Sequence, residues 1–331
     1  MNHLKQPNCL VVMYHYVHDE PPVVEGETVG PHQGIRGLTT RAFAEQIELL
    51  LASREPIDWP TLKKGIEGRT TLPRESFLLT FDDGLADHAR HVAPMLEERG
   101  LRGLFFVPGE TITDRRMLSA HAVHLLLSQL GDDELAEELR LTVSSMGYRP
   151  ELAEFSQTEG QLPPASSTAY RYESAVRAEI KAWLHLGLPI DLRRQVVDVL
   201  FERHIGSSTA WADRWYLSRE DVRALQSRGH TIGGHGFSHE PLARLTDNDR
   251  HADVSRCAQT LNEWLGTHER PISYPFGSFI QSTAEACRNA GFVQAFTTES
   301  RLADSTDDAM RVPRVDTIHV NQFLEKVPTC P

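Results

Sequence analysis

Short apolar segments alternate with longer amphipathic segments along most of the chain. Residues 9–17, 77–81 and 103–107 are almost wholly apolar, which predicts buried strands. Residues 41–53 and 86–100 instead repeat apolar side chains at helical spacing, which predicts amphipathic helices that face a core. Because strand, helix and strand follow one another in this order, the pattern predicts βαβ units, a parallel sheet and the α/β fold class.

The α/β pattern is interrupted in the middle of the chain. Residues 110–215 contain no convincing apolar strand but several segments of helical periodicity, so we interpret them as a helical insertion within one domain spanning residues 1–331. The alternation resumes at residue 218, where Ser-Arg-Glu-Asp is typical of a capping box at a helix start. Within the earlier helix at 86–100, Pro94 predicts a kink or a break.

Composition and charge narrow the class of protein. The 331 residues are 40% hydrophobic and 24% charged, which suffices for a sizeable core and excludes disorder of the whole chain. The formal net charge is −12 and no basic patch stands out, so we expect no nucleic-acid partner. No apolar run approaches the roughly 18–20 residues of a membrane-spanning helix, so we expect no transmembrane segment.

The four cysteines and the first residues bear on the cellular compartment. No Cys-x-x-Cys pair occurs, which argues against a zinc ribbon or a thioredoxin-like site; the cysteines are Cys9, Cys257, Cys287 and Cys330. The opening sequence MNHLKQPNCLVV lacks the apolar run and cleavage site of a signal peptide. We therefore expect a cytoplasmic protein, and the sequence does not indicate its oligomeric state.

Two adjacent carboxylates follow the second apolar strand. Asp82 and Asp83 come directly after residues 77–81 and precede Gly84. In parallel α/β folds, ligands and catalytic groups lie at the carboxyl ends of the strands. Adjacent carboxylates raise each other's pKa, and a bound cation relieves this repulsion, so that one carboxylate can bind the cation while the other acts as a base. An ordinary Asp-Gly turn with a helix cap is the structural alternative.

Two histidines four residues apart form the second candidate motif. His235 and His239 follow another short apolar segment, and in a helical segment this spacing would let both bind one metal ion. Two unrelated loop histidines are the structural alternative. Combined with one aspartate they would give three ligands and leave coordination positions open, as in catalytic rather than structural metal sites. The second aspartate beside such a site suggests metal-assisted hydrolysis.

Two further motifs follow later strands. Tyr274, Phe276 and Gly277 belong to a Tyr-Pro-Phe-Gly turn that could aim backbone N–H groups at substrate and at a developing oxyanion. Arg314 and Asp316 are two residues apart on a late strand, so we expect both on one face. There, Arg314 could orient the base carboxylate through a bidentate pair. A plain turn and a surface ion pair are the structural alternatives.

Taken in order, these motifs resemble those of a known enzyme family. TFDDG at 80–84, HGFSH at 235–239, YPFG at 274–277 and PRVD at 313–316 are similar to successive motifs of the polysaccharide deacetylase family. This family is also called the NodB-homology family or carbohydrate esterase family 4. The segment MYHYV at 13–17 resembles the motif at the first strand of many members.

The resemblance covers about residues 9–109 and 216–327, and the helical insertion lies outside it. It implies a distorted (β/α) barrel of about seven strands. It also implies one divalent metal ion, usually Zn²⁺, with Co²⁺, Ni²⁺ or Fe²⁺ as alternatives. The implied partner is an N-acetylated carbohydrate, from which the enzyme removes an N-acetyl group; some members remove an O-acetyl group or cleave another amide.

The resemblance assigns roles to residues that match the family motifs. It implies Asp82 as the catalytic base and three metal ligands, which are Asp83, His235 and His239. In the reaction so implied, a backbone N–H near Phe276 would help to stabilise the oxyanion, and a protonated histidine would deliver a proton to the leaving amine.

The sequence departs from the family pattern in two places. Ser273 stands where many members have the arginine that holds the catalytic aspartate. Arg314 is our candidate replacement, and Arg270 is a weaker one. The Leu-x-His motif that often supplies the general acid is also missing near the end of the chain. His15 and His319 are the candidate substitutes, with His15 preferred.

Other functions use similar residues. Two histidines and a carboxylate also form the iron site of some oxygenases, but those enzymes favour a jelly roll rather than a βα pattern. A metal-dependent amide hydrolase that acts on a small non-sugar substrate stays open as the alternative. A carbohydrate-binding protein without activity would not need both Asp82 and Asp83.

Overall fold

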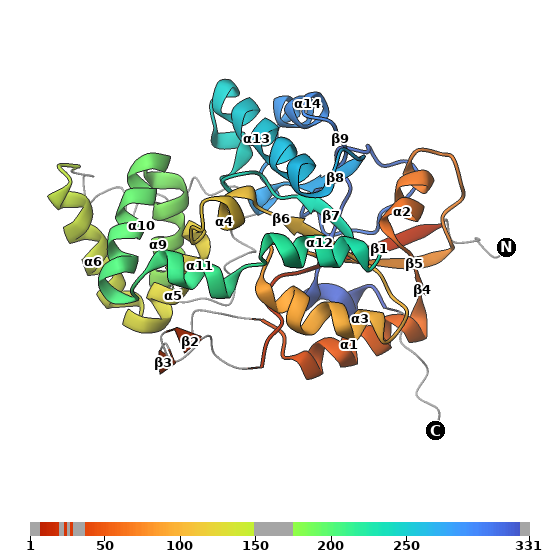
Figure 1. Cartoon of the computed structure of the whole chain (residues 1–331), viewed down its shortest axis with the longest axis horizontal. Coiled ribbons are helices and arrows are strands. Elements are labelled where there is room, and N and C mark those ends of the chain that lie inside the picture. The colour runs from red at the N-terminus through yellow and green to blue at the C-terminus, as the bar shows by residue number, and fades with distance from the viewer. Residues whose placement is uncertain (1–6, 20–22, 25–26, 29–36, 149–174, 325–331) are drawn as a thin grey trace. The chain divides into compact units, whose positions relative to one another are not determined.

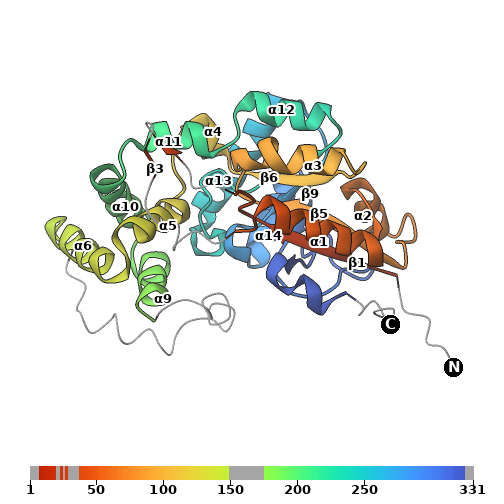
Figure 2. The ribbon, with the colours of Figure 1, turned by 90° about the horizontal axis from the view of Figure 1, so that it is seen from below.

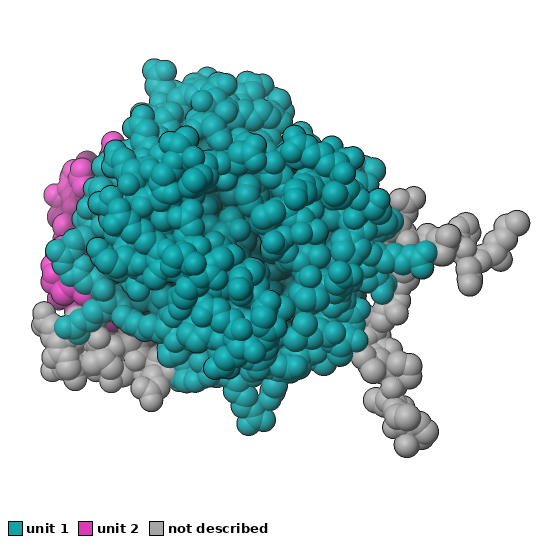
Figure 3. Space-filling view, turned by 45° about the vertical axis from the view of Figure 1, so that its right-hand side comes forward, with its two compact units in different colours: residues 1–20, 37–116, 212–331 teal, residues 21–36, 117–211 magenta. Residues whose placement is uncertain are grey.

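The computed structural model describes residues 7–19, 23–24, 27–28, 37–148 and 175–324 (Figure 1). The chain forms two compact units, which Figure 3 distinguishes by colour. Unit 1 comprises residues 1–20, 37–116 and 212–331, and unit 2 comprises residues 21–36 and 117–211. All the motifs of the sequence analysis lie in unit 1.

Unit 1 is built on a parallel sheet with seven strands in the order β10-β1-β5-β6-β7-β8-β9. The strands are β1 (Asn8–Tyr14), β5 (Glu75–Phe81), β6 (Gly103–Val107), β7 (Thr231–Gly234), β8 (Arg270–Ser273), β9 (Phe292–Phe296) and β10 (Val315–Asp316). The short β4 (Glu55–Pro56) pairs with β5 beside this row. The predicted strands at 9–17, 77–81 and 103–107 are confirmed as β1, β5 and β6.

The segment at residues 312–316, which ends in β10, contacts strands near both ends of the row. Val315 pairs in parallel with Val12 of β1, while Val312, three residues earlier, forms a parallel bridge to Phe296 of β9. This segment therefore connects β1 to β9, the strand at the opposite end of the row. This arrangement confirms the expected distorted (β/α) barrel.

Alternate side chains of the strands pack into two separate clusters. Phe105 and Val107 of β6 belong to a large cluster formed with the surrounding helices, whereas Leu104 and Phe106 belong to a second one. This alternation follows from the two-residue period of a strand. Strands that are covered on both sides must be apolar throughout, which explains the continuous apolar runs in the sequence.

Helices cover the outside of the sheet, and Figures 1 and 2 show α1, α3 and α12 side by side along the strands. The helices of unit 1 are α1 (Thr40–Ser53), α2 (Trp59–Ile66), α3 (Ala93–Glu97), α4 (Gly109–Thr113), α12 (Arg219–Ser227), α13 (Asp247–Leu265) and α14 (Gln281–Asn289). The predicted capping box is confirmed, since Ser218 and Asp221 cap α12 reciprocally. Of the kink or break predicted at Pro94, the structure shows an irregularity and no break: a π-helical turn at His88–Val92 precedes α3, and the backbone of Val92 and Ala93 stays helical.

The described part of unit 2 is helical within the insertion, as the periodicity predicts, and it also contains a short antiparallel pair, β2 (Val23–Val24) and β3 (Glu27–Thr28). Its helices are α5 (Ser119–Leu130), α6 (Asp132–Ser145), α9 (Ala175–Ala182) and α10 (Ile190–His204), and α11 (Ser208–Trp215) leads back into unit 1. Among the described helices, none is both long and apolar enough to cross a membrane. Cys9, Cys257 and Cys287 are buried thiols, and Cys330 lies outside the described residues.

Candidate metal centre

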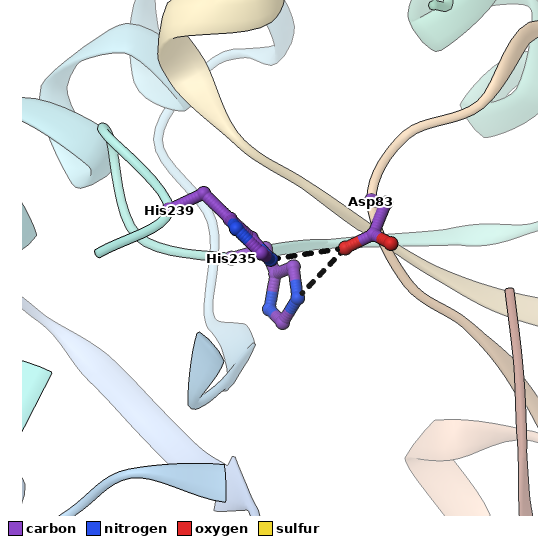
Figure 4. A group of neighbouring side chains, drawn as sticks. All are labelled: Asp83, His235 and His239. Carbon is purple, nitrogen blue, oxygen red and sulfur yellow. Dashed lines mark ion pairs between the residues drawn. The ribbon is translucent and has the colours of Figure 1, made fainter. Parts of the chain in front are cut away.

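Asp83, His235 and His239 converge at the carboxyl ends of β5 and β7 (Figure 4). The Oδ1 atom of Asp83 lies 3.3 Å from Nε2 of His235 and 3.1 Å from Nε2 of His239. All three side chains are buried, and their candidate ligand atoms lie within 4.8 Å of one another. The structure therefore brings together two motifs that are far apart in the sequence.

The backbone at this site is unusual. Among the described residues other than glycine, four have a left-handed φ, and three of these lie here: Asp83 (74°), His239 (58°) and Phe276 (58°). Such conformations cost of order 1–3 kcal/mol each and tend to persist where function needs them. At Asp83 the left-handed φ turns the chain away from the direction of β5, which ends at Phe81. The HGFSH segment is a loop rather than the helix considered from the spacing, so His239 reaches the site through its own backbone turn.

A hydrogen bond fixes the orientation of His235. Its Nδ1 donates to the backbone oxygen of Ser273 at 2.9 Å, so the lone pair of neutral His235 is on Nε2, which faces Asp83. Burial alone would lower the pKa of His235, but the nearby carboxylates of Asp82 and Asp83 outweigh burial and raise it. A metal ion would compete with a proton for this nitrogen.

The donor set fits a divalent transition metal. Two imidazole nitrogens and one carboxylate oxygen are ligands that Zn²⁺ accepts readily, and Co²⁺, Ni²⁺ and Fe²⁺ accept the same set. Three protein ligands would leave positions open for water or substrate. Among the described residues, this is the group of histidine, cysteine and acidic side chains whose spacing fits a metal ion.

Asp82 lies beside this group and is held by Arg314. The guanidinium donates to both carboxylate oxygens at 2.7 Å, and both side chains are buried. Arg314 also donates to Ser273 Oγ, Thr80 Oγ1 and the backbone oxygen of Thr297. Burial would raise the pKa of Asp82, but the charges of Arg314 and His235 and the hydrogen bonds from Arg314 lower it to about 2, so Asp82 is a carboxylate.

The comparisons with known proteins agree with the motifs. The family model described as "Polysaccharide deacetylase" matches residues 189–295, which include His235, His239 and the turn at Phe276. This match confirms the resemblance to the polysaccharide deacetylase family. Asp82 and Asp83 precede the matched segment. No curated protein matches this chain significantly.

Solved structures of polysaccharide deacetylases share the fold. The deacetylase PplD of Streptococcus pyogenes, solved in complex with acetate, is 12% identical over 97% of this chain and 100% of its own, with a TM-score of 0.57. IcaB from Ammonifex degensii is 19% identical over 97% of each chain, also with a TM-score of 0.57. A de-N-acetylase from Aggregatibacter actinomycetemcomitans is 14% identical over 96% of this chain and 100% of its own, with a TM-score of 0.55.

The structure shows which candidate arginine contacts Asp82. Arg314 directly precedes β10, and its guanidinium donates both to Asp82 and to the hydroxyl of Ser273. Arg270, the weaker candidate, instead donates to the backbone oxygen of Gly266. Of the candidates considered for orienting Asp82, the structure places Arg314 at the site.

Two other residues from the sequence motifs have local structural contacts instead. The carboxylate of Asp316 accepts from the N–H of Ile318 and caps a 3₁₀ turn at Thr317–Gln322, and its expected place on one face with Arg314 stays a prediction. The hydroxyl of Tyr274 donates to the backbone oxygen of Met310, and its backbone N–H donates to Phe296. Asp316 and Tyr274 are therefore occupied within the scaffold.

The turn after β8 still contributes one residue beside the metal group. The N–H of Gly277 donates to the backbone oxygen of Tyr274, so this N–H group is used within the turn. The ring of Phe276 lies 5.0 Å from the His239 ring and is 45% exposed. Phe276 is thus the member of this motif that borders the metal group.

The two candidate acids differ in position. His15 follows β1, next to β5, and its charge is among those that lower the pKa of Asp82. The backbone oxygen of His15 accepts a hydrogen bond from the buried His88 ring. His319 lies in the 3₁₀ turn and contacts Gln322. Proximity to Asp82 favours His15.

Asp253 on α13 was not predicted from the sequence, and its carboxylate accepts hydrogen bonds from the loop between the two histidines. A signal was available: Asp253 lies three residues after Arg250 and four before Cys257, on the buried side of the helix. An acidic residue at such a position needs hydrogen-bond partners.

Substitution of Arg314 by lysine tests its bidentate pair with Asp82. Lysine keeps the charge but cannot form the bidentate pair or the bonds to Ser273 and Thr297. We expect turnover to fall about tenfold and the free energy of unfolding to fall by about 1.5–3 kcal/mol, measured by urea denaturation. Arg311→Lys is the matched control, because Arg311 is an exposed arginine on the same segment. Identical behaviour of the two variants would contradict this role.

Proposed function

We propose that this chain is a metal-dependent hydrolase that removes the N-acetyl group from an N-acetylated sugar or glycan precursor. The observation that carries the proposal is the convergence of Asp83, His235 and His239 beside a carboxylate held by Arg314. The match to the polysaccharide deacetylase family and the shared fold support it. The proposed ligands are the three converging side chains, with Zn²⁺ as the first choice of metal.

The proposed chemistry divides between the metal and the surrounding side chains. When bound, a divalent ion would act as a Lewis acid toward the acyl carbonyl and a water molecule. Asp82 is the proposed base: each carboxylate oxygen can accept two hydrogen bonds, and Oδ1 accepts one, from Arg314. A protonated His15 is the proposed donor of the proton that the leaving amine takes up. The low pKa of Asp82 means that it holds the water proton only briefly, and this proton then replaces the one that His15 has given up.

Acetate release tests the proposal directly. The purified protein would be incubated with N-acetylglucosamine oligomers and, in parallel, with a simple formamide and a ureide, with and without added Zn²⁺ or Co²⁺. We expect metal-dependent acetate release from the sugars and loss of this release when a chelator is added. The Asp83→Ala variant should release no acetate. Turnover of the small amides without release from any N-acetylated sugar would overturn the sugar assignment in favour of a small-molecule amide hydrolase.

A further inference from the structure

The loop that joins His235 to His239 lacks the regular hydrogen bonds of a helix or a strand. It belongs to neither a helix nor a strand, and its backbone reverses through left-handed residues at Gly236 (φ 67°) and His239 (φ 58°). Regular pairing ends at His235, whose N–H donates to the backbone oxygen of Val107. The next backbone N–H groups need acceptors from elsewhere in the fold.

A single carboxylate on α13 supplies those acceptors. Oδ1 of Asp253 accepts from the N–H of Phe237 at 2.8 Å, and Oδ2 accepts from the N–H of Ser238 at 2.9 Å. The hydroxyl of Ser238 also donates to Oδ2. Each carboxylate oxygen of Asp253 therefore accepts a hydrogen bond from one of two consecutive residues in the middle of the segment between the two histidines. Charge-assisted hydrogen bonds of this kind are stronger than neutral ones.

Helix α4 holds the same loop from its carbonyl side. The N–H groups of Gly109 and Glu110 donate to the backbone oxygens of Gly236 and Phe237 at 3.3 and 2.8 Å. One turn after Asp253, the guanidinium of Arg256 lies 3.5 Å from the centre of the Phe237 ring. The carbonyl groups of the loop thus face α4 and its N–H groups face α13, where the carboxylate of Asp253 accepts from the N–H groups of Phe237 and Ser238.

We propose that Asp253 is a positioning residue of the metal centre, setting the separation and orientation of His235 and His239. The inference rests on the proposed metal site. Without the carboxylate, the N–H groups of Phe237 and Ser238 would lose their acceptors and the loop could relax away from its left-handed turn at His239. The ion would then have to order the loop on binding, which lowers its affinity.

Metal affinity distinguishes positioning from a merely structural role. We would prepare metal-free Asp253→Asn, Asp253→Ala and Ser238→Ala and titrate each with Zn²⁺ and Co²⁺ in competition with a chromogenic chelator. Loss of an outer partner of a metal ligand typically costs 10–100-fold in affinity. We expect about that loss for both Asp253 variants. Alanine removes both acceptors, and asparagine places its NH₂ group, a donor, against one of the two backbone N–H groups. Ser238→Ala keeps both backbone bonds and should lose only about threefold.

Asp249→Ala is the matched control. Asp249 is an exposed acid on the same helix and binds Thr246 at the helix cap, so its loss weakens α13 without touching the loop. We expect its metal affinity to equal that of the parent even though its melting temperature falls. An equal loss of affinity in Asp249→Ala, or affinities of both Asp253 variants within about twofold of the parent, would overturn the positioning role.

Two further variants keep the test decisive. If Asp253→Ala does not fold by circular dichroism, Asp253→Asn and Ser238→Ala decide, and the absence of a graded loss between them overturns the inference. His239→Ala reports on the metal site itself and should lose the ion. Retention of the ion by His239→Ala would refute the proposed site, whereas its loss together with parent-like Asp253 variants would refute only the positioning role.

Discussion

Replacing Asp83 or His239 by alanine should remove the metal ion and the hydrolytic activity together. The ion would have three protein ligands, and each substitution deletes one of them from a buried site. A catalytic site of this kind has three protein ligands, and two remaining ligands would hold a divalent ion poorly. The Lewis acid contributes several kcal/mol to the reaction, so we expect turnover to fall about 1000-fold or more.

Elemental analysis after dialysis measures the first effect, and acetate release measures the second. His251→Ala is the matched control, because His251 is an exposed histidine of α13 that is not a member of the group. It should keep both the metal and the activity. Full metal occupancy in Asp83→Ala or His239→Ala would show that the ligand assignment is incorrect.

The sheet could be predicted because its determinants are local. A strand of a parallel sheet is covered on both sides, so β1, β5 and β6 are visible as apolar runs without knowledge of the fold. The positions of Asp82 and Asp83 at a strand end follow from the same pattern. Their meeting with His235 and His239 needed one more premise, namely that the carboxyl ends of parallel strands lie at one edge.

Residues beyond the ends of short strands were harder to predict. The alternation rule placed Arg314 and Asp316 on one face, but β10 contains only Val315 and Asp316, and the chain turns directly after it. The Asp316 carboxylate accordingly caps that turn. At Tyr274, a side chain after the end of β8 points to Met310, a contact made over a long sequence separation. Strand periodicity carries no information about either case.

The arginine partner of Asp82 could be predicted in part from the chemistry of a buried carboxylate. A buried carboxylate requires a compensating charge, and Ser273 in place of the usual arginine meant that this charge had to come from elsewhere. Arg314 was a candidate because it lies in the PRVD motif on a late strand and an arginine can form a bidentate pair with a carboxylate. Thr80 and Ser273, which complete the hydrogen bonds of the guanidinium, could be identified only from the structure.

Asp82→Asn should retain the metal ion while turnover falls by about two to four orders of magnitude, the scale of general-base catalysis. Asparagine is nearly isosteric with aspartate and leaves Asp83, His235 and His239 untouched, but it cannot accept the proton of a water nucleophile. The substitution also leaves Arg314 as a buried charge without its carboxylate, which should lower the free energy of unfolding by about 3–5 kcal/mol.

The loss of stability must be separated from the loss of the base, and the double variant Asp82→Asn/Arg314→Met does this. Methionine replaces the buried charge by an apolar side chain, so the double variant should regain much of the lost stability in urea denaturation. Its turnover should stay as low as that of Asp82→Asn, because no base has been restored. Both proteins should bind Zn²⁺ in competition with a chelator. Turnover of Asp82→Asn within about threefold of the parent would show that Asp82 is not the base. Recovery of turnover in the double variant would show that Asp82 acts through stability.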